Sequence, residues 1–131
     1  MRAKLIEFIQ QHRRELVERT DDALLRNPTT REMVADYSHA ERENWIEEFF
    51  DSFIALLRDR HDLVLIDWHQ DTLERELLSG FSLIEAGVCL IVFRNQIKRL
   101  LWDKLTEPDQ RDTLLGIIRT VDREFDMQML K

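Results

Sequence analysis

The sequence predicts an all-α domain, from its composition, its few helix breakers and the spacing of its apolar residues. The chain has 131 residues, with only three glycines and two prolines. Leucine, glutamate and arginine, which favour helices, are abundant. Apolar residues recur at intervals of three and four along most of the chain, which is helical spacing. We therefore expect one domain, residues 1–131, of five long helices and one short helix, arranged as a bundle or in a globin-like manner.

The first part of the chain is expected to form two long helices separated by a short one. Residues 2–25 form the first helix, and its inward face consists of Leu5, Phe8, Ile9, Leu16 and Val17. The sequence NPTTRE at residues 27–32 breaks this helix and begins the short one. Ser38 and Glu41 form a capping-box pattern, in which each side chain satisfies the backbone amide of the other residue. They open a helix that ends near Asp59.

A fourth long segment, residues 60–80, ends at Gly80 in the position of a C-terminal cap. A core helix is expected to follow, from Ser82 to about Lys104, with Ser82 and Glu85 as a second capping box. Residues 81–93 are thirteen residues with a single charge, that of Glu85. A membrane span requires about 20 mainly apolar residues. We therefore expect a helix covered by its neighbours on several sides, with no membrane span.

The last helix is expected to begin at residues 106–109 (TEPD), with the proline near its first turn, where a missing amide hydrogen does no harm. Leu114, Ile118, Val121 and Phe125 are spaced by four, three and four, which is the seam pattern of a coiled coil. Two interpretations remain open. The helix packs on its own bundle, or it continues into an output domain or joins a second copy of the chain.

Charge and cysteine usage narrow the classes of protein and the compartment. The net charge of −7 argues against a general nucleic-acid binder, which needs a basic face. A single cysteine, Cys89, excludes an internal disulfide and fits a reducing compartment. The first twenty residues lack the unbroken apolar stretch of a signal peptide. We expect a cytoplasmic protein.

The usual signatures of catalysis and of cofactor binding are missing from the sequence. It contains no G-x-G-x-x-G, Walker loop, H-E-x-x-H or paired C-x-x-C motif. We therefore expect no enzymatic activity, no metal and no cofactor. Two alternatives rest on histidines. His69 lies between Ile66 and Leu73 on a helical wheel, and an inward histidine in a helical domain is able to hold haem iron or another cofactor. His12, followed by two arginines, fits a histidine phosphotransfer bundle.

Two residues of the core helix are candidates for a structural or signalling role. Gly87 costs about 1 kcal/mol relative to alanine inside a helix, so we expect another helix to approach it closely. Arg94 directly follows the apolar run. Its guanidinium either extends to water along the surface or holds a carboxylate on a neighbouring helix and so sets the register of the two helices.

Residues 80–105 resemble a segment of the RsbRD-type amino-terminal domains. The shared pattern, G-F-[small or apolar]-L-x-E … L … R … L, is matched here by Gly80, Phe81, Leu83, Glu85 and Arg94. The resemblance implies a helical, globin-like or bundle sensory domain without an established ligand, usually dimeric. Such domains precede stressosome-type STAS domains, histidine kinases or transcriptional regulators.

The leading hypothesis is a non-enzymatic, cytoplasmic signal-input domain that forms a homodimer through its long helices. Its last helix passes the signal to a downstream output domain or signalling protein. The first alternative is a globin-like sensor that binds haem or another cofactor through His69. The second is a histidine phosphotransfer bundle.

Overall fold

Helices account for nearly all of the chain that the structure, a computed structural model, describes: residues 1–59 and 83–129. The elements are α1 (Arg2–Gln11), α2 (Arg13–Arg26), α3 (Pro28–Met33), α4 (His39–Asp59), α6 (Leu83–Lys104), the 3₁₀ turn η1 (Pro108–Gln110) and α7 (Arg111–Met129). These residues include no strand, and the predicted all-α class is confirmed. The expected helix at residues 60–80, its cap Gly80 and the second capping box at Ser82 lie outside the described residues.

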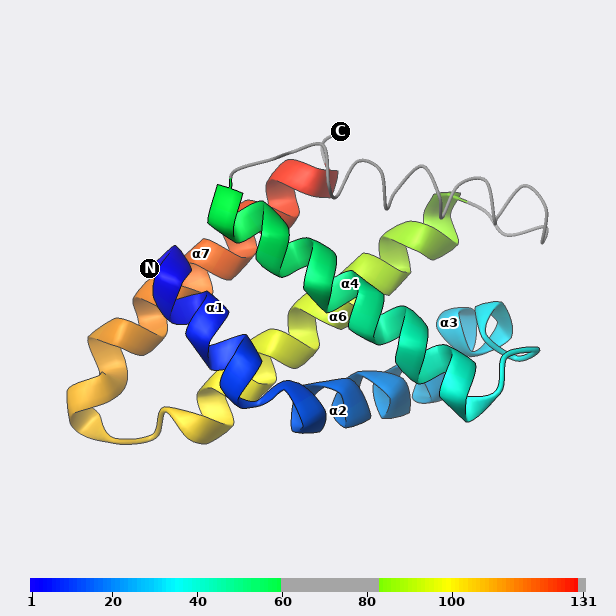
Figure 1. Cartoon of the computed structure of the whole chain (residues 1–131), viewed down its shortest axis with the longest axis horizontal. Coiled ribbons are helices and arrows are strands. Elements are labelled where there is room, and N and C mark those ends of the chain that lie inside the picture. Colours follow the sequence, from blue (N-terminus) through cyan, green and yellow to red (C-terminus); the bar gives the residue numbers. More distant parts are fainter. Residues whose placement is uncertain (60–82, 130–131) are drawn as a thin grey trace.

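The central element is α6 (Figure 1), which packs against α2 and α3 on one side and against α7 on the other. The first helix, α1, contacts α4 and α7, while α2 also contacts α4. The helix predicted from Ser82 to about Lys104 is therefore confirmed from Leu83 onward and lies at the centre of the domain. No helix among the described residues has the length and apolar character needed to span a bilayer.

The first helix differs from the prediction, because residues 2–25 form two helices that meet at His12. The backbone of His12 departs from helical angles, with φ −111° and ψ 21°. Hydrogen bonds still cross the junction, from the His12 amide to the Phe8 carbonyl at 3.0 Å and from the Leu16 amide to the His12 carbonyl at 2.9 Å. The chain thus bends without unfolding. The bend lets α1 reach α7 while α2 reaches α6.

The helix starts at α3 and α4 follow the capping chemistry of the sequence. The Ser38 amide donates to Glu41 Oε1 at 3.1 Å, and the Glu41 amide donates to Ser38 Oγ at 3.1 Å, so the predicted capping box is confirmed. Before α3, Asn27 Oδ1 accepts from the Thr29 amide at 2.9 Å. These local bonds fix where the two helices begin.

Aromatic rings fill the space between α4, α6 and α7. The fully or almost fully buried rings are Phe49, Phe50, Phe53, Phe93 and Phe125. Phe93 of α6 stacks on Phe49 with the ring centroids 4.0 Å apart, and it meets Phe50 edge-on at 5.7 Å. Phe53 lies 4.9 Å from Phe125 of α7. The cluster therefore joins three helices that are distant in the sequence.

The apolar seam of α7 faces the interior of its own domain. Leu114, Val121 and Phe125 are buried, and Ile118 packs against the core. The burial of these side chains therefore favours the first interpretation, in which the last helix packs on its own bundle along residues 111–127. Leu115 and Met127 remain exposed on the outer side.

The close helix approach expected at Gly87 is absent among the described residues. A Cβ placed there would meet no described heavy atom within 4 Å. Because the expected helix at residues 60–80 lies outside the described residues, the close approach at Gly87 stays a prediction. A close approach occurs at Gly116 of α7 instead, where a Cβ would lie 2.7 Å from Cε of Met1.

We expect Phe93→Ala to lower the free energy of unfolding by about 3–5 kcal/mol, because it leaves a cavity in the aromatic cluster. Urea unfolding measures the change. Leu115→Ala is the matched control, since Leu115 lies on α7 outside the aromatic cluster and is 38% exposed. We expect the control to cost less than about 1 kcal/mol. Equal losses in the two variants would contradict the role given to Phe93.

Candidate functional site

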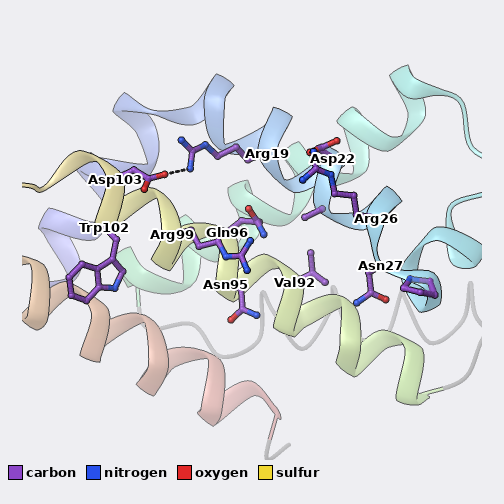
Figure 2. Close-up of a pocket in the computed structure, with 12 residues that line it drawn as sticks. Arg19, Asp22, Arg26, Asn27, Val92, Asn95, Gln96, Arg99, Trp102 and Asp103 are labelled. Atoms are coloured by element: carbon purple, nitrogen blue, oxygen red, sulfur yellow. Dashed lines mark hydrogen bonds and ion pairs between the residues drawn. The ribbon is translucent and has the colours of Figure 1, made fainter.

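A groove with a volume of about 920 Å³ lies between α2–α3 and α6 (Figure 2). Its lining residues are Arg19, Asp22, Ala23, Arg26, Asn27 and Pro28 on one side and Val92, Asn95, Gln96, Arg99, Trp102 and Asp103 on the other. On each long helix these residues recur at intervals of three and four, so each helix contributes one face. The volume lies within the range of about 300–1,000 Å³ that is usual for small-molecule sites.

Two of the three groove arginines are neutralised by carboxylates. Arg19 of α2 donates to Asp103 of α6 and so joins the two sides of the groove. The hydrogen bond from Arg19 to Asp103 raises the pKa of Arg19. Arg26 pairs with Asp22 one turn earlier, with 2.9 Å between nitrogen and oxygen. These charges are therefore already balanced.

The third arginine, Arg99, has no ion pair or hydrogen bond with any residue that the structure describes. The described residues of the groove lining include three guanidinium groups and two carboxylates, which leaves one net positive charge among them. The whole chain carries a net charge of −7. The groove is thus a local positive site on an acidic protein, and such a site attracts anions.

Gln96 is the most unusual residue of the groove. It is 8% exposed, and its side-chain amide has no hydrogen-bond partner among the described residues. The neighbouring Asn95 side chain also lacks one. Side-chain amides in buried positions normally find partners, and leaving such a group unpaired costs about 1–3 kcal/mol. Figure 2 places both amides beside Arg99 in the middle of the groove, where a ligand is able to supply the missing bonds.

One end of the groove is apolar and the other is aromatic. Val92 is 7% exposed and lies toward Asn27, which Pro28 follows in the chain (Figure 2). Trp102 lies at the opposite end and is 55% exposed. The groove therefore offers polar groups in its middle and an apolar surface on the side of Val92.

A different face of α6 is joined to α7 by two ion pairs. Lys98 Nζ lies 3.0 Å from Asp122 Oδ1, and Arg94 Nη1 lies 3.7 Å from Asp126 Oδ1. Both intervals are four residues, so the pairs form successive steps between antiparallel helices. The Arg94 side chain is 23% exposed, and its Nε is buried without a hydrogen-bond partner among the described atoms. Arg94 thus lies within ion-pair distance of an acidic residue on a neighbouring helix, and its role in setting the register of the two helices stays a prediction.

The predicted site residues that the structure describes, Glu85, Gly87 and Arg94, do not line the groove. His69, Gly80 and Phe81 lie outside the described residues, and with them the basis of the haem alternative. Glu85 lies in the first turn of α6, and neither it nor Gly87 lines the groove. The sequence analysis missed the groove because its two faces meet only after folding. The sequence feature that points to the groove is the polar group of Asn95, Gln96 and Arg99, which closely follows the apolar run.

The surroundings of His12 do not favour phosphotransfer. Its ring packs against Phe8 with the ring centroids 4.6 Å apart. The two following arginines, Arg13 and Arg14, are engaged by carboxylates of α4, including Glu47 and Glu43. They are therefore not free to stabilise a phosphoryl group. In the part of the chain that the structure describes, no three histidine, cysteine, aspartate or glutamate side chains are grouped to hold a metal ion.

Comparisons with known proteins give no relative from which a function can be transferred. No protein-family model, no curated protein and no solved structure matches the chain. The resemblance to RsbRD-type domains stays a prediction from the sequence.

We expect Gln96→Leu to leave the free energy of unfolding unchanged or to raise it by up to about 1 kcal/mol. Leucine keeps most of the side-chain volume and removes an amide that has no partner among the described residues. Urea unfolding of the parent and of the variant measures this. A loss of more than about 1 kcal/mol would mean that the amide makes a stabilising bond in the folded chain.

Proposed function

We propose that the chain is a non-enzymatic signal-input domain. A small molecule in the groove shifts α6, and α7 carries the shift onward to an output domain or signalling protein. The observation that carries this proposal is the double role of α6. One face lines the groove with Asn95, Gln96 and Arg99, while another face pairs with α7 through Arg94 and Lys98.

The ion pairs between α6 and α7 have the character of an adjustable connection. Lys98 and Asp122 are 30% and 40% exposed, and Asp126 is 62% exposed. Exposed pairs contribute only about 0.2–1 kcal/mol each. Such pairs are therefore able to break and re-form when α6 moves. A ligand drives that movement only by binding one position of α6 more tightly than the other.

The side chains of the groove suit binding better than catalysis. Guanidinium and amide groups bind and orient a ligand, whereas catalysis by a general base needs an available carboxylate, histidine or similar group. Among the described lining residues the two carboxylates, Asp22 and Asp103, each form an ion pair with an arginine, and no histidine lines the groove. This supports a sensory role over an enzymatic one.

Filling the groove by mutation tests the transmission without a known ligand. We expect Asn95→Trp, which places an indole in the groove, to change amide hydrogen exchange in α7 by roughly 2–5-fold, because altered pairs between α6 and α7 change local opening by up to about 1 kcal/mol. Adding Arg94→Met and Lys98→Met removes the connection and is expected to abolish most of that change. Hydrogen–deuterium exchange with mass spectrometry provides the measurement.

Lys4→Trp is the matched control for this experiment. Lys4 is an exposed residue of α1 that lies outside the groove and has no ion pair with the described residues. It is expected to leave exchange in α7 at the parental rate. Unchanged exchange in α7 of Asn95→Trp, at parental stability, would refute transmission through α6.

We further propose that the domain forms a homodimer through α6. Ile84 is 78% exposed and Ile91 is 38% exposed, and they lie two turns apart on this helix. Exposed apolar residues on one helix face are typical of an interface between proteins. The helix seam of α7, by contrast, is largely buried within its own domain.

Sedimentation at micromolar concentration is expected to give a species of twice the 15.8 kDa chain mass. Ile91→Glu is expected to shift it to the monomer, because a buried unpaired carboxylate opposes association. Leu115→Glu is the control, since Leu115 is equally exposed at 38% but lies on α7. A parental chain that sediments only at 15.8 kDa would rule out the dimer.

A further inference from the structure

We infer that the groove between α2–α3 and α6 binds a small monocarboxylate with an apolar body. This inference rests on the site used in the proposed function and specifies the chemical class of its ligand. Three observations carry it: among the described residues the Arg99 guanidinium has no partner, the buried Gln96 amide has none, and the charges of the groove lining leave one net positive charge.

The middle of the groove has the groups that a carboxylate requires. A guanidinium binds a carboxylate through two parallel N–H···O bonds, a geometry that a point charge does not reproduce. Arg99 is the groove arginine without a carboxylate partner among the described residues. The side-chain amides of Asn95 and Gln96 line the same groove (Figure 2), and their nitrogens are able to donate further bonds to a bound carboxylate.

The burial of Gln96 indicates that this constellation is a built site rather than an accident of the surface. Its position on α6 follows the apolar run, and 92% of its surface is covered, since it is 8% exposed. Its amide atoms are not among the fully enclosed, unpaired atoms of the described residues, so they still reach the groove. A bound carboxylate would supply the hydrogen-bond partner that the protein leaves out.

Charge selects a monoanion over a dianion. One carboxylate matches the single net positive charge of the described lining residues. A phosphate monoester carries up to two negative charges near neutral pH. The second charge would remain unbalanced in a groove that also holds Asp22 and Asp103. Like charges in a partly enclosed site repel each other, which disfavours the dianion.

The body of the ligand is expected to lie toward Val92. This buried residue, with Ala23 and Pro28 in the same lining, gives an apolar surface beside the polar middle. A pocket with a few polar groups that fix one end of a ligand and an apolar surface for the rest is the usual arrangement for small molecules. Arg99 would then bind the carboxylate of the ligand, and Val92, Ala23 and Pro28 would contact its apolar body.

Three small probes of nearly equal shape test the inference in the full chain. Benzoate carries one negative charge, benzamide carries none and phenyl phosphate carries up to two. Two-dimensional NMR titration of ¹⁵N-labelled protein reports binding through the side-chain amide signals of Asn95 and Gln96. We expect benzoate to bind at millimolar concentration and benzamide to bind at least about tenfold more weakly, since a hydrogen bond to a charged group contributes about that factor or more. Phenyl phosphate is expected to bind more weakly than benzoate because its second negative charge is unbalanced in the groove.

Variants then assign the binding to this site. Arg99→Gln is expected to weaken benzoate binding at least about tenfold, whereas Arg119→Gln, an exposed arginine of α7 without a partner among the described residues, is expected to leave it unchanged. Gln96→Leu is expected to weaken binding while the urea midpoint stays at or above the parental value. The second variant separates a binding role from a structural one, because a merely structural glutamine would affect the midpoint.

The possible outcomes separate this inference from the proposed function. Equal binding of benzoate and benzamide, tighter binding of phenyl phosphate, or an unchanged affinity in Arg99→Gln would each overturn the monocarboxylate. Absence of benzoate binding would also overturn the monocarboxylate. The proposed signalling function is tested separately, by the change of hydrogen exchange in α7 of Asn95→Trp. If benzoate binds at Arg99 but exchange in α7 does not respond to filling the groove, the ligand class stands and the signalling role falls.

Discussion

The stacking of Phe93 on Phe49 is the contact on which the arrangement of the helices depends. It fixes the rotation of α6 about its own axis, because both rings are fully buried and a rotated α6 would expose one of them. Once that rotation is set, the other faces of α6 are set with it. Arg94 and Lys98 then face α7, and the row of Asn95, Gln96 and Arg99 faces α2. The groove is thus a consequence of aromatic packing elsewhere on the same helix.

The ion pairs divide the domain into a stiff side and an adjustable one. Between α2 and α4, the buried carboxylate of Asp21 accepts from Arg42 Nε at 2.7 Å, and the two side chains are only 8% and 13% exposed. The hydrogen bond to Asp21 raises the pKa of Arg42. Breaking such a pair leaves an uncompensated charge in a buried site, so this junction resists movement. Between α6 and α7 the pairs are more exposed, as for Lys98 and Asp122, and are cheaper to rearrange. Movement of α6 is therefore expected along α7 rather than at the junction of α2 with α4.

Local chemistry made part of this fold predictable from the sequence, and tertiary packing decided the rest. The start of α4 could be predicted from the sequence because Ser38 and Glu41 lie within four residues and hydrogen-bond to each other's backbone amides. The bend at His12 was not, since nothing in the local spacing shows that α1 and α2 must reach different neighbours. At Gly87 the helix propensity alone does not indicate which residues lie opposite. The groove was missed for a related reason. Asn95 and Arg99 look like an ordinary polar turn of a helix until α2 is packed against them.

The groove face of α6 is polar where stability alone would favour apolar residues. Val92 lies one turn before Gln96 on the same face and is almost equally buried, at 7% against 8% exposed. A leucine at position 96 would continue that apolar surface without leaving an amide unpaired. Proteins keep stability-lowering polar groups chiefly at sites where those groups serve binding or catalysis. The fully paired arginines of the same groove, Arg19 and Arg26, show that the chain does neutralise charge here where a ligand is not needed. The proposed binding site therefore rests on the buried amide of Gln96 together with the exposed Arg99, and neither side chain has a partner among the described residues.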